Sequence, residues 1–328
     1  MRAISLFSGG LDSMLAVAMM REQNIDVTAI YIKTGFGSTK DVTDEVKKRA
    51  EMAGADFLDI DVREEYIKDI LFDPVYGYGK NFNPCIDCHG YMFKIARAML
   101  AKLDASFIVT GEVVGQRPMS QRAEALRQVS SLAGDREEKL ILRPLSAKLL
   151  EPSTPETEGW VERERLLDIS GRNRERQLAM AAEYGWEDYE SPGGGCLLTE
   201  PAFSAKMRDF IEHEEFAVED IELLKYGRHF RLPGASKLVV GRNREDNEAL
   251  LAIENEDYIP IRLPVTGPFS LLYRGAGEED RRLAAKIALT YGRSTPTESY
   301  DVYVGDESYR VSPFESKSEA QRYFVLGK

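Results

Sequence analysis

A run of small and polar residues near the N-terminus has the composition of a phosphate-binding loop. It follows an apolar stretch and opens a helical pattern, and its members are Ser8, Gly9, Gly10, Leu11, Asp12 and Ser13. Glycines let the backbone turn tightly and expose its N–H groups, and a helix N-terminus adds partial positive charge. The two serines supply hydroxyl donors, and Asp12 can orient a magnesium ion. Because the Gly-Lys-Ser/Thr of a Walker A loop and the Gly-x-Gly-x-x-Gly of a dinucleotide site are both absent, we expect another kind of phosphate site.

The three cysteines form the second group of residues that could do chemistry. Cys85 and Cys88 make a C-x-x-C pair followed by His89, and Cys196 follows the glycines at 193–195. A small, odd number of cysteines argues against a disulfide framework. The C-x-x-C-H pattern of haem attachment is excluded because no export signal precedes it. Buried structural thiols, catalysis or metal binding remain, with Cys85, Cys88 and Cys196 as candidate metal ligands.

The elements that would position these residues alternate between strand and helix patterns. Strand-like runs cover residues 3–7, 27–32, 57–62 and 106–110, and helical patterns cover 11–21, 41–53 and 91–103. This order predicts an α/β fold with a doubly wound parallel sheet. Ligands bind beyond the carboxyl ends of such strands. The phosphate-binding run, Thr34 and Gly111 each follow a predicted strand, so we expect all three at the nucleotide site.

Ser-Gly-Gly-x-Asp-Ser resembles the PP-loop signature of the ATP pyrophosphatases. That family includes GMP, NAD and argininosuccinate synthetases and tRNA-modifying enzymes. The resemblance implies an adenine nucleotide alpha hydrolase-like domain that binds ATP with Mg²⁺ and cleaves it between the α- and β-phosphates. It also implies that a substrate carbonyl oxygen takes the AMP, which a nucleophile then displaces, with Asp12 as a catalytic residue.

Further segments resemble the tRNA thiouridine synthetases. Asn-Pro-Cys-x-x-Cys at 83–88 is similar to a segment of the 2-thiouridine enzymes. Residues 110–116 with 120–121, and residues 141–145, are similar to the 4-thiouridine enzymes. On this resemblance Gln116 and Arg117 are expected to contact ATP phosphates or the target nucleotide. An arginine fork suits phosphate because it binds two oxygens at once.

The cysteines leave three interpretations open. A C-x-x-C pair with a distant third cysteine also resembles the iron–sulfur tRNA thiolation enzymes, in which three thiolates hold a [4Fe–4S] cluster. Alternatively, Cys85 or Cys196 is catalytic, one carrying a persulfide that the other resolves. A structural zinc bound by the three thiols and His89 is the third interpretation. We favour the cluster.

Composition and charge set the wider expectations. The 328 residues suit two or three domains, which we place at 1–160 (ATP binding and adenylation), 161–200 (charged helix and glycine-rich cysteine loop) and 201–328 (a smaller α+β domain). The net charge of −12 gives no overall support to nucleic-acid binding. A basic run with interleaved aromatics at 225–244 predicts a local RNA face instead. Without a long apolar stretch or a signal peptide, we expect a cytoplasmic protein with no membrane span.

These observations favour an ATP-dependent tRNA sulfurtransferase that adenylates a uridine carbonyl and replaces its oxygen with sulfur. The sulfur donor is undefined, and a homodimer is compatible with the sequence. Two alternatives stay open. One is a PP-loop enzyme that transfers an amide or sulfur to a small molecule. The other is a nucleotide- or RNA-binding protein with a structural zinc.

Overall fold

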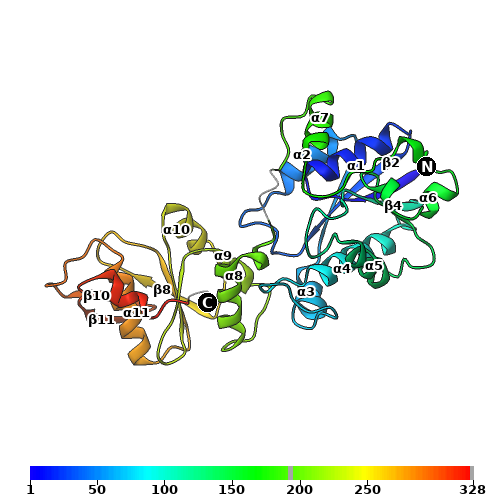
Figure 1. Ribbon diagram of the computed structural model, residues 1–328. Helices are drawn as coiled ribbons and strands as arrows, with labels where there is room; N and C mark the ends of the chain where they lie inside the picture. Colours follow the sequence, from blue (N-terminus) through cyan, green and yellow to red (C-terminus); the bar gives the residue numbers. More distant parts are fainter. Residues whose placement is uncertain (191–194, 326–328) are drawn as a thin grey trace. The chain divides into compact units, whose positions relative to one another are not determined.

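The computed structural model describes residues 1–190 and 195–325 and forms two units (Figure 1). Unit 1 comprises Met1–Cys196 and unit 2 comprises Leu197–Lys328. Of the glycine-rich run predicted before Cys196, residues 191–194 lie outside the described residues. Within the described ranges, no helix has both the length and the apolar character that a membrane span requires.

The centre of unit 1 is a five-stranded parallel sheet with the order β3-β2-β1-β4-β5. Its strands are β1 (Arg2–Leu6), β2 (Asp26–Lys33), β3 (Asp56–Asp61), β4 (Phe107–Thr110) and β5 (Ile141–Leu142). Every neighbouring pair is parallel, so all the carboxyl ends meet at one edge. The strand order reverses between β1 and β4, which is where open α/β sheets bind ligands. The predicted doubly wound parallel sheet is confirmed.

Helices cover both faces of this sheet (Figure 1). One layer contains α1 (Leu11–Arg21), α2 (Thr43–Met52) and α7 (Glu175–Glu183), and both α2 and α7 contact α1. The other layer contains α4 (Cys85–Met99) and α5 (Ala123–Leu132), which contact each other. Shorter helical segments are α3 (Arg63–Tyr66), a π-helical turn at Ile67–Leu71, and α6 (Thr154–Thr157).

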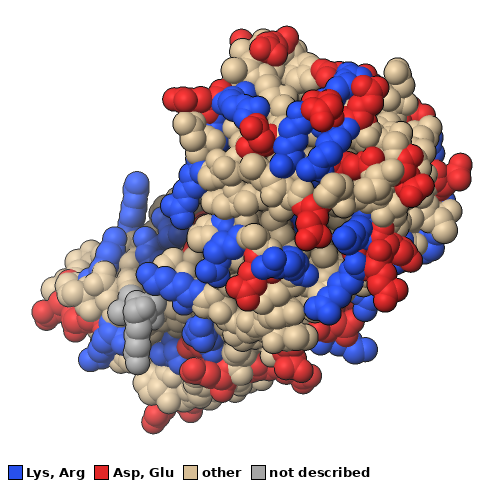
Figure 2. Space-filling model, turned by 45° about the vertical axis from the view of Figure 1, so that its right-hand side comes forward, with Lys and Arg blue, Asp and Glu red and all other residues tan. Residues whose placement is uncertain are grey.

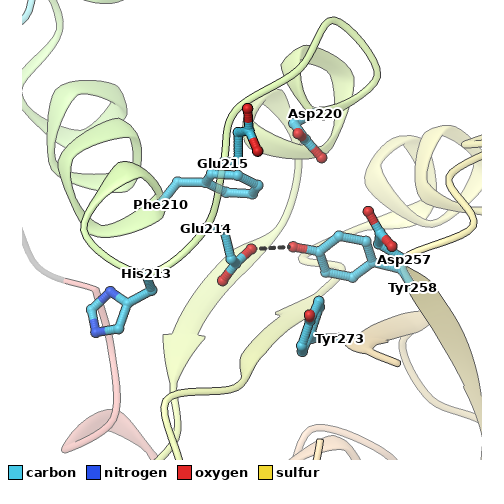
Figure 3. Close-up of a pocket in the computed structure, with 8 residues that line it drawn as sticks. All are labelled: Phe210, His213, Glu214, Glu215, Asp220, Asp257, Tyr258 and Tyr273. Atoms are coloured by element: carbon cyan, nitrogen blue, oxygen red, sulfur yellow. Dashed lines mark hydrogen bonds between the residues drawn. The ribbon is translucent and has the colours of Figure 1, made fainter. Parts of the chain in front are cut away.

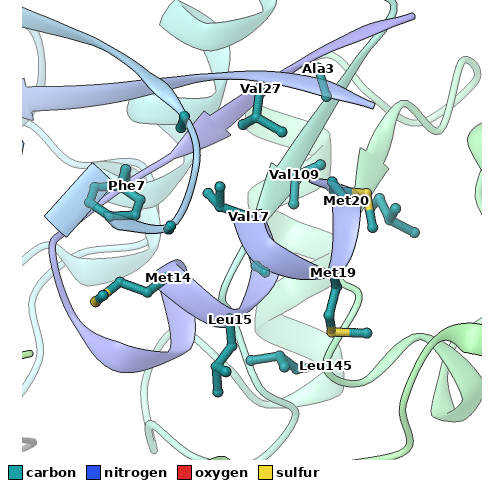
Figure 4. Packing of buried hydrophobic residues seen from close by; sticks show 14 of the residues in the cluster. Ala3, Phe7, Met14, Leu15, Val17, Met19, Met20, Val27, Val109 and Leu145 are labelled. Carbon is teal, nitrogen blue, oxygen red and sulfur yellow. The ribbon is translucent and has the colours of Figure 1, made fainter. Parts of the chain in front are cut away.

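Helix α1 is buried between the sheet and the outer helices of its layer, which explains why it is apolar almost all round (Figure 4). Met14, Met19 and Met20 pack there with Val17 and with Val109 of β4. Unbranched methionine side chains fill irregular gaps between elements. This packing fixes the start of α1, and therefore the phosphate-binding run, relative to the sheet.

One predicted element is wrong. The charged pattern at 162–183 suggests a single helix, but only Glu175–Glu183 forms an α-helix, and Arg163–Arg165 forms a 3₁₀ turn. The backbone N–H groups of Leu167 and Ile169 donate instead to the carbonyls of Pro144 and Leu145. This extended pairing beyond β5 competes successfully with helix propensity, which is a weak preference.

Unit 2 is built on a six-stranded antiparallel sheet with the order β11-β10-β8-β9-β7-β6. The strands are β6 (Arg228–Arg231), β7 (Lys237–Val240), β8 (Tyr258–Arg262), β9 (Ser270–Tyr273), β10 (Tyr300–Val304) and β11 (Glu307–Val311). The helices are α8 (Pro201–Ile211), α9 (Asp220–Lys225), α10 (Arg244–Leu251), α11 (Glu278–Thr290) and α12 (Lys317–Gln321). The predicted α+β architecture of the C-terminal part is confirmed.

A buried ion cluster attaches α8 to this sheet. Lys237 of β7 is 0% exposed, and its Nζ lies 2.5 Å from Asp209 Oδ2 of α8. Arg231 of β6 binds both Asp209 oxygens, at 3.1 and 2.8 Å, and Glu214 Oε1 at 2.5 Å. Tyr258 donates to the other Glu214 oxygen at 2.9 Å. These side chains neutralise one another, so this part of the predicted basic run is internal structure and not an exposed RNA face.

Candidate functional site

The phosphate-binding run forms the sharp turn between β1 and α1. Gly9 has φ of +76°, a conformation that side chains rarely adopt, and extended Gly10 precedes the first helical residue. Ser13 donates from its backbone N–H and its hydroxyl to the Gly10 carbonyl, at 3.0 and 2.7 Å. Leu11 is fully buried, so only its backbone can contribute to a ligand site. The first N–H groups of α1 lack intrahelical acceptors and suit an anion.

Gly111, at the end of β4, presses directly against the start of α1. A Cβ at this position would lie 2.5 Å from the Asp12 carbonyl carbon and from the Ser13 nitrogen. Such a separation is far below contact distance, so only glycine fits here. The need for this close approach explains why glycine follows the buried strand.

Asp12 is the polar centre of the loop. Its Oδ2 accepts a hydrogen bond of 3.0 Å from Gln116 Nε2, while its buried Oδ1 has no hydrogen-bond partner among the described residues. A buried oxygen without a donor is costly unless a ligand or ion satisfies it. The donor set, one carboxylate oxygen beside a phosphate-binding turn, therefore fits a magnesium ion that travels with a nucleotide.

The loop after β4 links the phosphate-binding turn to the cysteine segment. Gln116 reaches Asp12, and Met119 Sδ lies 3.3 Å from Asn83 Nδ2. The same Asn83 amide donates to Cys85 Sγ at 3.1 Å. The structure thus places Gln116 beside Asp12, whereas Arg117 is exposed and Thr34 is buried beyond β2. Within residues 1–190 and 195–325, neither of these two side chains makes a hydrogen bond or ion pair to the turn.

The C-x-x-C pair occupies the first turn of α4, which begins at Cys85. Asp87, between the two cysteines, is only 3% exposed and accepts from the backbone N–H groups of Val75 and Tyr76, at 2.7 and 3.1 Å. The sequence places Asp87 inside the motif without revealing its task. That task is to clamp the preceding loop over the start of α4.

Tyr66 lies among the cysteines, although no sequence pattern pointed to it. It is 1% exposed, and its hydroxyl interacts with the thiol of Cys88. Burial raises the pKa of Tyr66 well above its usual value, and the nearby charges of Cys88, Cys196 and Cys85 raise it further. All three cysteines therefore lie within electrostatic range of one buried hydroxyl.

The surroundings of Cys88 disfavour its charged form. Burial raises its pKa to about 12, although the Tyr66 hydrogen bond opposes the shift. Within the described residues, no group of three or more His, Cys, Asp or Glu side chains is arranged to hold a metal ion. The three cysteines are partly buried, and all of them lie near Tyr66.

A buried triad lies next to Cys88. His89 Nδ1 and Glu112 Oε1 are 2.9 Å apart, and Arg143 Nε donates to Glu112 Oε2 at 2.9 Å. Burial pushes the pKa of Glu112 upward, but Arg143 and His89 outweigh it and lower the pKa below its ordinary value. Arg143 Nη2 is buried without a partner among the described residues, so it retains an available donor. Glu112 immediately follows Gly111 at the end of β4. Its position after a strand is the one feature of the sequence that could have marked it as a site residue.

Two contacts hold the segment that leads to Cys196. Asp188 accepts from Lys48 at 2.8 Å and from Arg49 at 3.1 Å, both on α2. Glu190 pairs as an isolated β-bridge with Gly10. The chain therefore returns to the phosphate-binding turn at Glu190, six residues before the third cysteine. Glu190 and Gly10 are far apart in sequence, so no local pattern could have predicted this contact.

Two protein families match the chain. Residues 1–148 match the family described as thiamine biosynthesis protein (ThiI). Residues 1–148 belong to the PP-loop family that includes the thiouridine synthetases. Residues 227–324, which lie beyond the PP-loop domain, match the family described as NFACT protein RNA binding domain.

Curated relatives of the PP-loop domain carry thiolation names. The tRNA-specific 2-thiouridylase MnmA 1 of Fusobacterium nucleatum is 32% identical over 108 residues, covering 32% of this chain and 28% of that protein. The MnmA of Bacillus licheniformis is 23% identical and covers 95% of this chain and 90% of that protein. The chain spans only 28% and 62% of the Fusobacterium nucleatum and Shouchella clausii relatives. A solved 4-thiouridine synthetase–RNA complex with bound ATP is 17% identical at a TM-score of 0.41, covering 68% of this chain and 52% of that one.

Unit 2 contains a pocket of about 300 Å³ that is independent of the PP-loop domain (Figure 3). Its lining combines aromatic and acidic side chains: Phe210, His213, Glu214, Glu215, Asp220, Asp257, Tyr258 and Tyr273. Burial raises the pKa of Asp220 to about 6. Because the carboxylates repel phosphate, this pocket is not suited to nucleic acid.

Proposed function

We propose that the protein is an ATP-dependent tRNA sulfurtransferase that adenylates a uridine carbonyl oxygen and replaces it with sulfur. The observation that carries the proposal is the bridge from Asp12 through Gln116 and Met119 to Asn83 and Cys85. An activating site and a sulfur-bearing site must act on one substrate atom, so they need a short and ordered connection. Relatives named tRNA 2-thiouridylases support the same chemistry.

ATP would bind with its phosphates at the N-terminus of α1. The N–H groups of Gly9 to Asp12 and the hydroxyl of Ser8 would contact the phosphates, with the exposed Arg117 as a further candidate donor, while Ser13 would hold the turn through its bonds to the Gly10 carbonyl. Asp12 would hold Mg²⁺ through its unpartnered Oδ1, with Gln116 fixing the carboxylate. The uridine oxygen attacks the α-phosphate, pyrophosphate leaves, and the oxygen later departs with AMP when sulfur attacks the same carbon.

The cysteines would supply the sulfur-handling part of the site. Cys85, Cys88 and Cys196 would hold a [4Fe–4S] cluster, a role for which thiolate donors are suited. The cluster when bound would offer an iron position for a sulfide-level sulfur. Asn83 would orient Cys85 through its hydrogen bond, and Tyr66 would contact Cys88. Persulfide formation on Cys85 or Cys196, or a structural zinc, would use the same residues.

The substrate assignment rests on two independent features. The family match of residues 227–324 names an RNA-binding domain, and the curated relatives act by name on tRNA. An enzyme that acts on a small molecule would not need the domain at residues 227–324, whose family is described as RNA-binding.

The proposal is tested with protein purified without oxygen. We expect about four irons and four acid-labile sulfides per chain, and ATP-dependent formation of thiouridine in tRNA with release of AMP. Cys85→Ala should abolish both iron binding and thiolation. Asp12→Asn should retain the iron but lose AMP release, because it changes only the nucleotide site. Thiolation by iron-free protein would show that persulfide chemistry, and not a cluster, supplies the sulfur. AMP release only with a small amide acceptor would refute the tRNA assignment.

A further inference from the structure

Two cations of unit 2 are held by the ring of Tyr291, near the end of α11. The guanidinium carbon of Arg228 lies 4.8 Å from the ring centroid, and Lys317 Nζ lies 5.6 Å from it. Both distances are within the range of cation–π attraction. Arg228 also donates to the Gly241 carbonyl at 2.9 Å, which further fixes its position.

Two more cations are held in the same way close by. Lys286 Nζ lies 4.1 Å from the centroid of the Phe314 ring. The guanidinium carbon of Arg322 lies 5.8 Å from the Phe314 ring and 4.8 Å from the Tyr323 ring. We call Arg228, Lys286, Lys317 and Arg322 the ring-held cations.

The ring-held cations differ from the other basic side chains of this sheet domain. Most of the others are paired with carboxylates: Arg231, Lys237, Arg242, Arg244, Arg262, Arg281, Arg282 and Arg310. The ring-held cations have no carboxylate within 4.0 Å among the described residues. An aromatic ring orders a cation without cancelling its charge. Their N–H donors therefore remain available to an anionic partner.

The backbone brings these four side chains onto one part of unit 2. Arg231 N–H of β6 donates to the Tyr323 carbonyl at 2.9 Å, and Val325 N–H donates to the His229 carbonyl at 3.0 Å. The C-terminal segment therefore runs beside β6, and α12 contacts α11. Two carboxylates share that segment, exposed Glu315 and Glu319, and Glu319 is engaged by the backbone N–H of Ser316 in the helix cap. Figure 2 shows Lys and Arg side chains interspersed with Asp and Glu side chains on the drawn face.

We propose that the ring-held cations form the surface on which this protein binds the phosphate backbone of its RNA. The inference rests on the proposed function and specifies the part of unit 2 that contacts the substrate. Arginine forks and lysine ammonium groups bind phosphate oxygens strongly when their own carboxylate partners are absent. Contacts of this kind fix the position of an RNA and carry no sequence information. The acidic net charge of −12 makes such an uncompensated group distinctive.

The test measures binding of an unmodified tRNA transcript to the full chain as a function of salt, by fluorescence anisotropy. The test variant combines Arg228→Gln, Lys286→Gln, Lys317→Gln and Arg322→Gln. We expect the slope of log K against log salt to become shallower by about 3, since each phosphate contact contributes about 0.7 to 0.9. The matched control combines Arg244→Gln, Arg262→Gln, Arg282→Gln and Arg310→Gln, which removes the same charge from carboxylate-paired sites. The control should keep a slope within about 1 of the wild type.

A second measurement does not depend on folding of the variant. Acetylation of wild-type lysines, read by mass spectrometry, should show Lys286 and Lys317 protected by tRNA and exposed again at high salt. Equal slopes for the test variant and the control, with no such protection, overturn the proposal. Binding of anionic phosphatidylglycerol vesicles but not of tRNA would overturn it in favour of a lipid surface.

The failure of this surface and the failure of the proposed function are distinguishable. If wild-type protein thiolates tRNA but the test variant binds RNA with an unchanged slope, only the surface is wrong. If the ring-held cations bind RNA yet no thiouridine forms under any condition, the surface stands and the sulfurtransferase assignment fails.

Discussion

Each unit of the protein buries a cluster of oppositely charged side chains. The two clusters differ in how completely their hydrogen-bonding groups are satisfied. In unit 2, both oxygens of Asp209 and both oxygens of Glu214 accept hydrogen bonds, from Arg231, Lys237 and Tyr258. In unit 1, Glu112 is fully engaged by His89 and Arg143, but Arg143 Nη2 has no partner among the described residues.

Among the described residues, the difference separates a cluster whose groups are all engaged from one that retains a free donor. A fully satisfied buried network fixes how elements dock, as α8 does on its sheet, and it has nothing left to offer a ligand. An unsatisfied donor in a native protein calls for an explanation such as a ligand or ion. Arg143 Nη2 and Asp12 Oδ1 both lie near the carboxyl edge of the parallel sheet, where a substrate is expected.

Asp209→Ala should produce the largest change in stability. It leaves Lys237, which is 0% exposed, with no carboxylate at Nζ, and removing one partner of a buried pair costs about 3–5 kcal/mol. Urea unfolding followed by far-UV circular dichroism measures the loss. Release of AMP by unit 1 should keep its rate under native conditions. The control is Asp306→Ala, a fully exposed partner of Arg262, which should change stability by less than about 0.5 kcal/mol.

Glu112→Gln should cost about 2–3 kcal/mol of stability, because the amide keeps one hydrogen bond but leaves Arg143 buried without a counter-charge. The pKa of Glu112 is lowered in the folded protein, so its stabilisation is present above the normal carboxyl pKa and is lost as pH falls below it. The gap in unfolding free energy between wild type and variant should therefore shrink at acid pH. Unlike Asp209→Ala, this variant should also lose thiolation at least tenfold. Retained thiolation would show that the triad of His89, Glu112 and Arg143 has only a structural role.

Asp220→Asn tests a buried carboxyl that is partly satisfied, by Ala217 N–H at 2.9 Å and by Asn255 at 2.9 Å. Burial raises the pKa of Asp220 to about 6, so the folded state binds a proton more readily than the unfolded state. Wild-type stability should then fall as pH rises from about 4 to about 6, by on the order of 2 kcal/mol relative to the variant. Parallel pH profiles for the two proteins would contradict the raised pKa.

Gln116→Ala should have the smallest effect on stability and a selective effect on activity. Removing the 3.0 Å hydrogen bond to Asp12 leaves that carboxylate unrestrained at the nucleotide site. We expect kcat/KM for AMP release to fall about tenfold, or about 1.4 kcal/mol, while unfolding free energy changes by less than about 0.5 kcal/mol. Gln128→Ala on α5 is the matched control. Equal activity of the two variants would show that Gln116 has no positioning role.

Patterns of short range were sufficient to predict most of the architecture. The alternation of strands and helices predicted the parallel sheet, because each element is specified by its own hydrophobic period. The turn at Ser8–Ser13 was predicted for the same reason, since its glycines and its position after a strand are local features. The helix expected over 162–183 failed because its first half bonds to Pro144 and Leu145 instead.

The candidate site was only partly accessible from the sequence. Gln116 was expected near the phosphates and does reach Asp12. Tyr66, Asp87 and Glu112 were not assigned roles, since each acquires its role from a partner on another element. The basic run of unit 2 was informative only in part, because Lys237 lies in the core whereas Arg228 is held by an aromatic ring without a carboxylate partner among the described residues.

The phosphate-binding turn, the parallel sheet and the pair of cysteines at the start of a helix were predictable from sequence, because all of them depend on neighbours in the chain. Which charged groups pair with each other, and which remain available to a ligand, became visible only in the folded protein. That distinction depends on burial and on partners far away in sequence, such as Arg143 for Glu112 and Asp209 for Lys237. A charged residue looks the same in a sequence whether a carboxylate, an aromatic ring or an open site faces it.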